Sequence, residues 1–196
     1  MKVAIHITGT SPLLMHNPQM VDPEFALNRQ IRALTSKKRR TDEDLKQIER
    51  LEWYGGLYTS NGDGGPPIVV QPTSKVRKCL IEAAKITKQG KAVERALSIM
   101  DLNTPLIYKG PKNIDELFKL PQFTSRLSVG IAQKRVMRVR PQFLPWELKL
   151  DALFIEDAGL NKDEFESIVQ SAGLTTGIGD GRSIGYGRFT GKVTWK

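Results

Sequence analysis

Cysteine and histidine are scarce in this 196-residue sequence, which has one cysteine, Cys79, and two histidines, His6 and His16. A single cysteine excludes an internal disulfide and a cysteine-rich zinc site. No stretch approaches the roughly 18 apolar residues of a membrane span. Lys2, His6 and Thr8 interrupt the first apolar residues, so no signal peptide is expected. We therefore expect a cytoplasmic protein of a bacterial or phage-infected cell, with no membrane partner, cofactor or metal.

Acidic residues are outnumbered, because 30 lysines and arginines face 21 aspartates and glutamates, a formal net charge of +9. This balance favours nucleic acid or another polyanion as the partner, and the alternative is a protein that is merely basic. Aromatic residues make up only 7% of the chain. Electrostatics should then outweigh base stacking, for which Tyr186 is best placed, followed by Trp53 and Tyr54.

The distribution of apolar residues predicts a mixture of strands and helices. Residues 2–8 alternate as a half-buried strand, 68–70 form a short buried strand, and 126–140 are expected as strand–turn–strand. Pro72 and Ser74 mark a helix start, and Asn161 with Glu164 forms a capping-box pattern at the start of the last helix. Further strands are expected at 147–155 and 184–195. Residues 17–67, with an N-cap at Thr41, are expected to form a helical insertion.

This order is compatible with a split β-α-β arrangement and predicts the α+β class. We expect a ferredoxin-like or RRM-like antiparallel sheet with helices on one face, in a single domain over residues 1–196. Such a sheet leaves its other face free, and RRM-type domains use that face for single-stranded RNA.

Seven of the 17 glycines lie between Gly173 and Gly191, in the run GLTTGIGDGRSIGYGRFTG. Glycine allows positive φ and close backbone approach, and bared N–H groups beside arginine suit a polyanion. The spacing matches neither a P-loop nor a dinucleotide fingerprint, and the run follows a helix and precedes a strand, the reverse of both. The plain alternative is a tight turn between the last helix and the last strand.

Three segments resemble the RAMP superfamily, the RRM-like proteins of CRISPR effector complexes. GIGDGRSIGYGRF resembles the family's glycine-rich loop. VVQPTSKVRKCL is similar to the proline-serine segment that opens the first helix in the backbone-forming branch, with Thr73 where that branch has glycine. The first strand with residues 9–13 looks like that branch's first strand and turn, and the whole chain also resembles a group of phage-encoded proteins.

The resemblance implies a protein that binds single-stranded nucleic acid along a crRNA-like path and assembles as a homo-oligomeric filament, with residues 17–67 as a thumb. The residues themselves also favour nucleic-acid binding, because the N-terminus of the helix that begins near Ser74 offers free backbone N–H groups to a phosphate. The basic strand pair at 134–140 is expected to form a groove for nucleic acid. The alternative is a solvated charged face on an edge strand. The candidate nucleic-acid-binding residues are Ser74, Lys75, Arg77, Lys78, Lys134, Arg135, Arg138, Arg140, Gly179, Gly181, Arg182, Tyr186 and Arg188.

Two other function classes stay open. His16 lies near where RAMP ribonucleases of the processing branch carry a histidine, so a metal-independent endoribonuclease is one alternative, with His16 as general base. The backbone branch sometimes carries a catalytic loop aspartate, for which Asp22 and Asp63 are candidates. The other alternative is a CRISPR-related inhibitor or assembly factor that binds protein. We favour a binding protein over a nuclease.

Overall fold

The computed structural model describes residues 1–61, 65–131 and 134–196, which form two compact units. The sheet unit contains Met1–Leu13, Thr59–Lys109 and Leu144–Lys196. The helix–hairpin unit contains Leu14–Tyr58 and Gly110–Phe143. Each unit is described by itself below.

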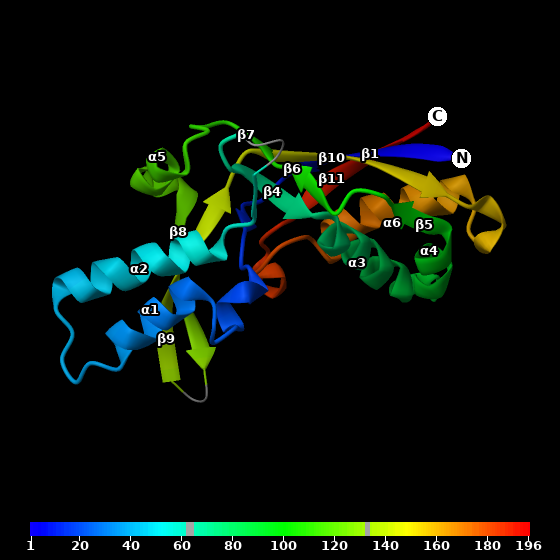
Figure 1. The fold of residues 1–196 in the computed structure, drawn as a ribbon. Helices are drawn as coiled ribbons and strands as arrows, with labels where there is room; N and C mark the ends of the chain where they lie inside the picture. Colours follow the sequence, from blue (N-terminus) through cyan, green and yellow to red (C-terminus); the bar gives the residue numbers. More distant parts are fainter. Residues whose placement is uncertain (62–64, 132–133) are drawn as a thin grey trace. The chain divides into compact units, whose positions relative to one another are not determined.

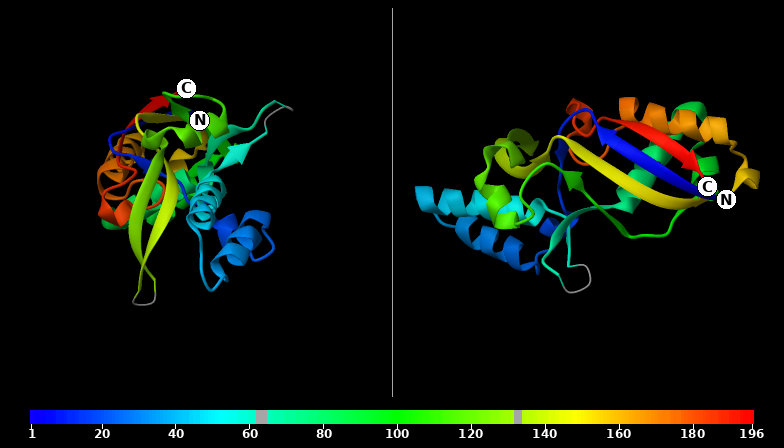
Figure 2. Two further views of the ribbon diagram at one scale, coloured as in Figure 1. Left: turned by 90° about the vertical axis from the view of Figure 1, so that its left-hand side faces the viewer. Right: turned by 90° about the horizontal axis from the view of Figure 1, so that it is seen from above.

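The sheet unit is built on an antiparallel sheet of β1 (Lys2–Gly9), β5 (Leu97–Ile99), β10 (Trp146–Phe154) and β11 (Phe189–Trp195). These strands lie in the order β11-β1-β10-β5, and β7 (Ile107–Tyr108) pairs with the start of β10. The first strand is central and the last strand is at its side, as in a ferredoxin-like sheet. The predicted α+β, ferredoxin-like class is therefore confirmed (Figures 1 and 2).

Helices α3 (Thr73–Ala84), α4 (Gly90–Ala96) and α6 (Lys162–Thr175) lie on one side of this sheet (Figure 1). Val3, Ile5 and Ile7 of β1 alternate toward that side and are fully buried. The capping box of α6 forms as predicted, because the Glu164 N–H donates to Asn161 Oδ1 and the Asn161 N–H donates to Glu164 Oε2, both at 2.9 Å. The capping box fixes the start of α6, and the apolar stripe of this helix packs on the buried face of the sheet.

A second small sheet in this unit has the order β3-β4-β6, from β3 (Thr59–Ser60), β4 (Ile68–Pro72) and β6 (Asn103–Pro105). Strand β4 leads directly into α3, which begins at the predicted position. The Thr104 hydroxyl donates to the Lys149 carbonyl at 2.7 Å and so joins β6 to β10. Single 3₁₀ turns complete the unit at Lys85–Thr87, Glu156–Ala158 and Arg182–Ile184.

The helix–hairpin unit contains α1 (Ala26–Thr35), α2 (Asp42–Gly56) and α5 (Ile114–Lys119), with 3₁₀ turns at Pro18–Val21 and Pro121–Phe123. Strands β8 (Thr124–Ile131) and β9 (Lys134–Phe143) form a long antiparallel hairpin, and β2 (Leu13–Leu14) pairs with β9. Figure 2 shows the hairpin as a twisted two-stranded ribbon. Its strands lie where the sequence predicted strand–turn–strand.

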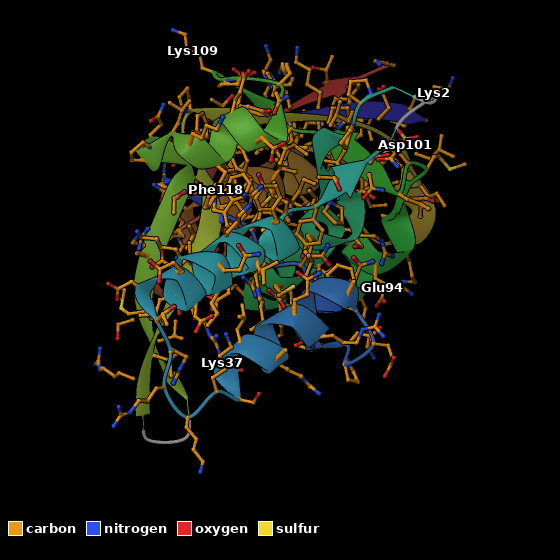
Figure 3. The ribbon with its side chains drawn as sticks, turned by 60° about the vertical axis from the view of Figure 1, so that its left-hand side comes forward. Lys2, Lys37, Glu94, Asp101, Lys109 and Phe118 are labelled. Atoms are coloured by element: carbon orange, nitrogen blue, oxygen red, sulfur yellow. The ribbon has the colours of Figure 1, made fainter. Side chains whose placement is uncertain are left out.

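Two features of α2 stabilise this unit, the capping box at its first turn and the aromatic cluster at its end. Thr41 caps α2 in a reciprocal capping box with Asp44, and the Trp53 indole donates to the Phe123 carbonyl at 2.9 Å. Phe118 of α5 packs edge-on against Trp53. Figure 3 shows Phe118 beside α5 and Lys37 in the segment between α1 and α2.

Two expectations need correction. The last strand begins at Phe189 and not at residue 184, because Gly185 and Gly187 have positive φ and so break the extended chain. Trp53 is 0% exposed and cannot stack on a base. The insertion at 17–67 stays a prediction. The structure groups α1 and α2 with the hairpin at 124–143, and it assigns β3 to the sheet unit.

Candidate nucleic-acid interface

The glycine-rich loop of the sheet unit connects α6 to β11 and turns repeatedly through left-handed backbone. Gly177, Gly179, Gly181, Gly185 and Gly187 all have φ between 67° and 95°. The 3₁₀ turn Arg182–Ile184 stands between two of them, Gly181 and Gly185. Other residues adopt this conformation only at a cost, so the loop's own path demands glycine here.

Contacts with the segment after β1 fix the loop. The Gly187 N–H donates to the Pro12 carbonyl at 2.8 Å. The Ser11 hydroxyl donates to the Gly185 carbonyl at 2.9 Å and accepts from the Arg188 N–H at 2.8 Å. A Cβ on Gly187 would lie 1.7 Å from the Ile178 carbonyl oxygen. Backbone geometry thus accounts for much of the glycine density, and anion binding by the loop stays a prediction.

Glu82 of α3 is the residue that brings part of the predicted site together, and nothing in the sequence pointed to it. Its carboxylate pairs with Arg182 Nη1 at 2.7 Å and lies 4.0 Å from Lys78 Nζ. Arg188 donates through Nη2 to the Arg182 carbonyl at 3.1 Å, and its buried Nη1 has no hydrogen-bond partner among the described residues. Lys78 and Arg182 therefore lie around Glu82, and Arg188 is joined to them through the Arg182 carbonyl. Tyr186 of the same loop is half-buried.

The first turn of α3 is a separate position. Pro72 provides no side-chain cap, and the Thr73 N–H donates to the Leu102 carbonyl at 3.0 Å. Ser74 and Lys75 are exposed at this turn. Ser74 precedes Glu82 by eight residues, which is about 12 Å along a helix.

Arg77 makes a structural contact inside the unit. Its Nε donates to the Leu97 carbonyl at 3.3 Å and its Nη2 donates to the Glu94 carbonyl at 2.6 Å. The side chain therefore joins α3 to the end of α4 and the start of β5.

The uncovered face of the main sheet is polar, and its lysines were missed in the sequence. The strand register puts His6 directly opposite Lys149 on β10 and Lys192 on β11. His6 Nε2 also lies 2.8 Å from Glu147 Oε2. The described residues that alternate to this face include no aromatic side chain: Lys2, Ala4, His6, Thr8, Glu147, Lys149, Asp151, Leu153, Thr190, Lys192 and Thr194. Base stacking in the manner of an RRM sheet therefore has no platform here.

In the helix–hairpin unit, two arginines of the basic hairpin form ion pairs with α2. Arg126 pairs with Glu49, and Arg138 Nη1 pairs with Glu52 Oε1. Glu52 Oε2 also accepts the Val139 N–H at 3.0 Å. These arginines therefore hold the hairpin against α2.

The other predicted hairpin cations differ in exposure. Arg135 is exposed, Arg140 is half-buried, and the side chain of Lys134 lies outside the described residues. Lys38, Arg39 and Arg40, between α1 and α2, are also exposed.

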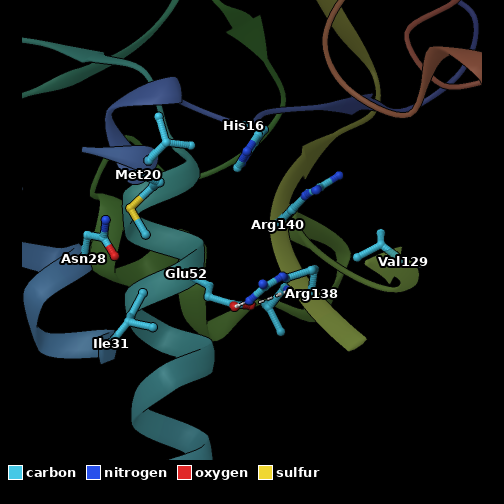
Figure 4. Close-up of a pocket in the computed structure, with 11 residues that line it drawn as sticks. His16, Met20, Asn28, Ile31, Glu52, Val129, Arg138 and Arg140 are labelled. Carbon is cyan, nitrogen blue, oxygen red and sulfur yellow. Dashed lines mark hydrogen bonds and ion pairs between the residues drawn. The ribbon is translucent and has the colours of Figure 1, made fainter. Parts of the chain in front are cut away.

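A pocket of about 410 Å³ opens between α2, the hairpin and the segment after β2 (Figure 4). His16, Arg138 and Arg140 line it together. The pKa of the Arg140 guanidinium is lowered, first by burial and then by the charge of Arg138, while Glu52 raises it. The remaining lining residues are Met20, Val21, Asn28, Ile31, Glu52, Val129, Gly130 and Val139.

The candidate catalytic aspartate Asp22 does not line this pocket. Asp22 is exposed at the end of a 3₁₀ turn and its Oδ1 accepts the Glu24 N–H at 2.9 Å. Asp63 lies outside the described residues. Within the part of the chain that is described, no group of three or more histidine, cysteine, aspartate or glutamate side chains is arranged to hold a metal ion.

Comparisons with known proteins give a fold likeness. No family model and no curated protein matches the sequence. Among solved structures, a chain of a "Type IV-B CRISPR Complex" matches with a TM-score of 0.50 at 10% sequence identity. The match covers 99% of this chain and 90% of that chain, so the two share a fold over nearly their whole length. Over the described ranges, no helix has both the length and the apolar character to cross a membrane.

Proposed function

We propose that this protein binds single-stranded nucleic acid as a subunit of a CRISPR-related assembly, several copies following one strand. The observation that carries the proposal is the distribution of charge. The helix–hairpin unit contains 15 lysines and arginines against nine aspartates and glutamates, so +6 of the net +9 resides in the smaller unit. A concentration of this kind attracts a polyanion. The fold likeness to a chain of a CRISPR complex supports the class of assembly.

The exposed cations are the best candidates for phosphate contacts. A guanidinium already paired with a carboxylate gains less from a phosphate, because the existing pair must first be broken. Arg138 and Arg182 are paired in this way with Glu52 and Glu82. The exposed group therefore contributes most of the affinity in our proposal: Lys38, Arg39, Arg40, Lys75, Arg135, Lys149 and Lys192.

Fluorescence anisotropy with labelled single-stranded RNA and DNA of equal length tests this function. Binding should weaken steeply between about 50 and 200 mM salt. Replacing Lys38, Arg39 and Arg40 by glutamine should reduce the log–log salt slope by about 2, since each phosphate of a single strand that the protein neutralises contributes roughly 0.7 to that slope.

Lys85, Lys88 and Lys91 give a matched control triple. These three lysines are also exposed and lie around the α3–α4 connection. Replacing them by glutamine removes the same charge as the first triple substitution. The control should leave the slope nearly unchanged. Equal effects of the two triples would contradict the assignment of the surface. An absence of binding to either strand at low salt would overturn the function, and a protein-binding inhibitor or assembly factor would then be the hypothesis to test.

One observation favours a second candidate, a metal-independent endoribonuclease. His16 lines the same pocket as Arg138 and Arg140, which combines a general base with cations that stabilise a phosphorane. Such an enzyme cleaves RNA but not a 2′-deoxy strand, because the 2′-hydroxyl is the nucleophile. Cleavage that disappears in His16→Ala would support it, and intact RNA after prolonged incubation with the wild-type protein would exclude it.

A further inference from the structure

The pocket of the helix–hairpin unit has two chemically different sides. Figure 4 shows Met20 and Ile31 on the side of α1 and α2, and Arg138 and Arg140 projecting from β9 on the other. Its volume of about 410 Å³ falls within the roughly 300–1,000 Å³ typical of pockets for small ligands. A pocket that is apolar on one side and cationic on the other suits an anion with a flat, apolar body.

Glu52 fixes the cationic side. Its side chain is only 10% exposed, and its two oxygens engage Arg138 Nη1 and the Val139 N–H. This contact holds Arg138 at the pocket wall, since a guanidinium presents its donors in a rigid fork. Arg138 and Arg140 thus present two guanidinium groups on this side of the pocket.

Arg140 is half-buried, and its guanidinium interacts with the charge of Arg138. Burial lowers the pKa of its guanidinium, and the neighbouring charge of Arg138 lowers the pKa further. A phosphate accepts charge-assisted hydrogen bonds from guanidinium groups and would favour the charged form of Arg140.

We propose that this pocket binds one nucleotide, with its phosphate at Arg140 and at the Arg138 donors that do not face Glu52, and its base against Met20 and Ile31. The choice of a nucleotide among amphipathic anions rests on the proposed function. Asn28 of α1 also lines the pocket, and its Nδ2 donates to the Asp22 carbonyl at 2.7 Å. The nucleotide is either a free nucleoside monophosphate or one unit of a bound strand, which share this chemistry.

Isothermal titration of the full chain with AMP, UMP and inorganic phosphate tests the site. A nucleoside monophosphate should bind more tightly than phosphate, since the base adds apolar contact. Arg140→Gln should weaken nucleotide binding roughly tenfold or more, because a hydrogen bond between charged groups is removed. The matched control is Lys46→Gln on α2, which removes one exposed positive charge of the same unit outside the pocket lining. It should change the affinity less than about twofold.

A second variant guards against misfolding of the first. Val129→Phe keeps every charge and fills part of the pocket, so it should abolish nucleotide binding. Circular dichroism melting curves show whether each variant folds.

The outcomes are distinct. No affinity of the wild-type chain for either monophosphate, or equal effects of the Arg140 and Lys46 variants, would overturn the pocket proposal. Strand binding without nucleotide binding would overturn the pocket alone. Nucleotide binding without strand binding would overturn the proposed function and leave a site for free nucleotides. Loss of strand affinity in Val129→Phe would identify the nucleotide as a unit of the strand.

Discussion

Alanine at Gly187 would place a methyl group where the glycine-rich loop has no room for it. The new Cβ would lie 1.7 Å from the Ile178 carbonyl oxygen, and φ is +69° at this residue. Left-handed backbone costs an L-residue roughly 1–2 kcal/mol, and an overpacked methyl group costs a further 1–3 kcal/mol or so. We therefore expect Gly187→Ala to lower the free energy of unfolding by about 2–5 kcal/mol.

Gly185 is a matched control two residues earlier. Its φ is +95°, but a Cβ there meets nothing within 4 Å. Gly185→Ala should therefore cost only the backbone contribution of roughly 1–2 kcal/mol. Both substitutions reduce the entropy of the unfolded chain equally, so this effect cancels from the comparison.

Urea denaturation measures the difference. Trp146 and Trp195 both lie in the sheet unit and report on its unfolding through their fluorescence. The Gly187 variant should be about 1–3 kcal/mol less stable than the Gly185 variant. Equal stabilities would refute the argument that close backbone approach, beyond positive φ, requires glycine at residue 187.

Two further predictions concern single side chains. Glu52→Gln should destabilise the helix–hairpin unit by about 1–3 kcal/mol, because a nearly buried carboxylate loses its charge opposite Arg138. Glu49→Gln, which affects a more exposed ion pair, should cost at most about 1 kcal/mol. Trp53 fluorescence reports the unfolding of both variants. A larger loss of stability in the Glu49 variant would contradict the role given to the Glu52–Arg138 pair. Cys79 is 1% exposed and burial raises the pKa of its thiol to about 12, so a thiol reagent should label it only after denaturation. Complete labelling of the native protein within minutes would show that the thiol is accessible.

The elements near the start and end of the chain could be predicted because local chemistry decides them. The alternation in β1 and the Asn161–Glu164 pair act within a few residues of the chain, and the structure contains both. The start of the last strand could not be placed in the same way. The residues after 184 alternate like a strand, but Gly185 and Gly187 take positive φ where the loop contacts Ser11 and Pro12.

Side-chain partners were the main feature that sequence reasoning left out. Arg138 and Arg182 looked like cations available to nucleic acid, yet both face glutamates on other elements, Glu52 and Glu82. These partners are 86 and 100 residues away in the chain. The spacing of charges along one strand or loop carries no signal of such a contact.

The sequence by itself determined the α+β class, the basic net charge, the helix starts at Thr41 and Asn161 and the glycine-rich turn, because propensity, capping and composition are local properties. Only the tertiary structure decided that the hairpin at 124–143 belongs with α1 and α2, and that His16, Arg138 and Arg140 line one pocket. Those outcomes depend on contacts between distant segments. Packing and charge pairing in three dimensions select such contacts, and no single window of the sequence contains them.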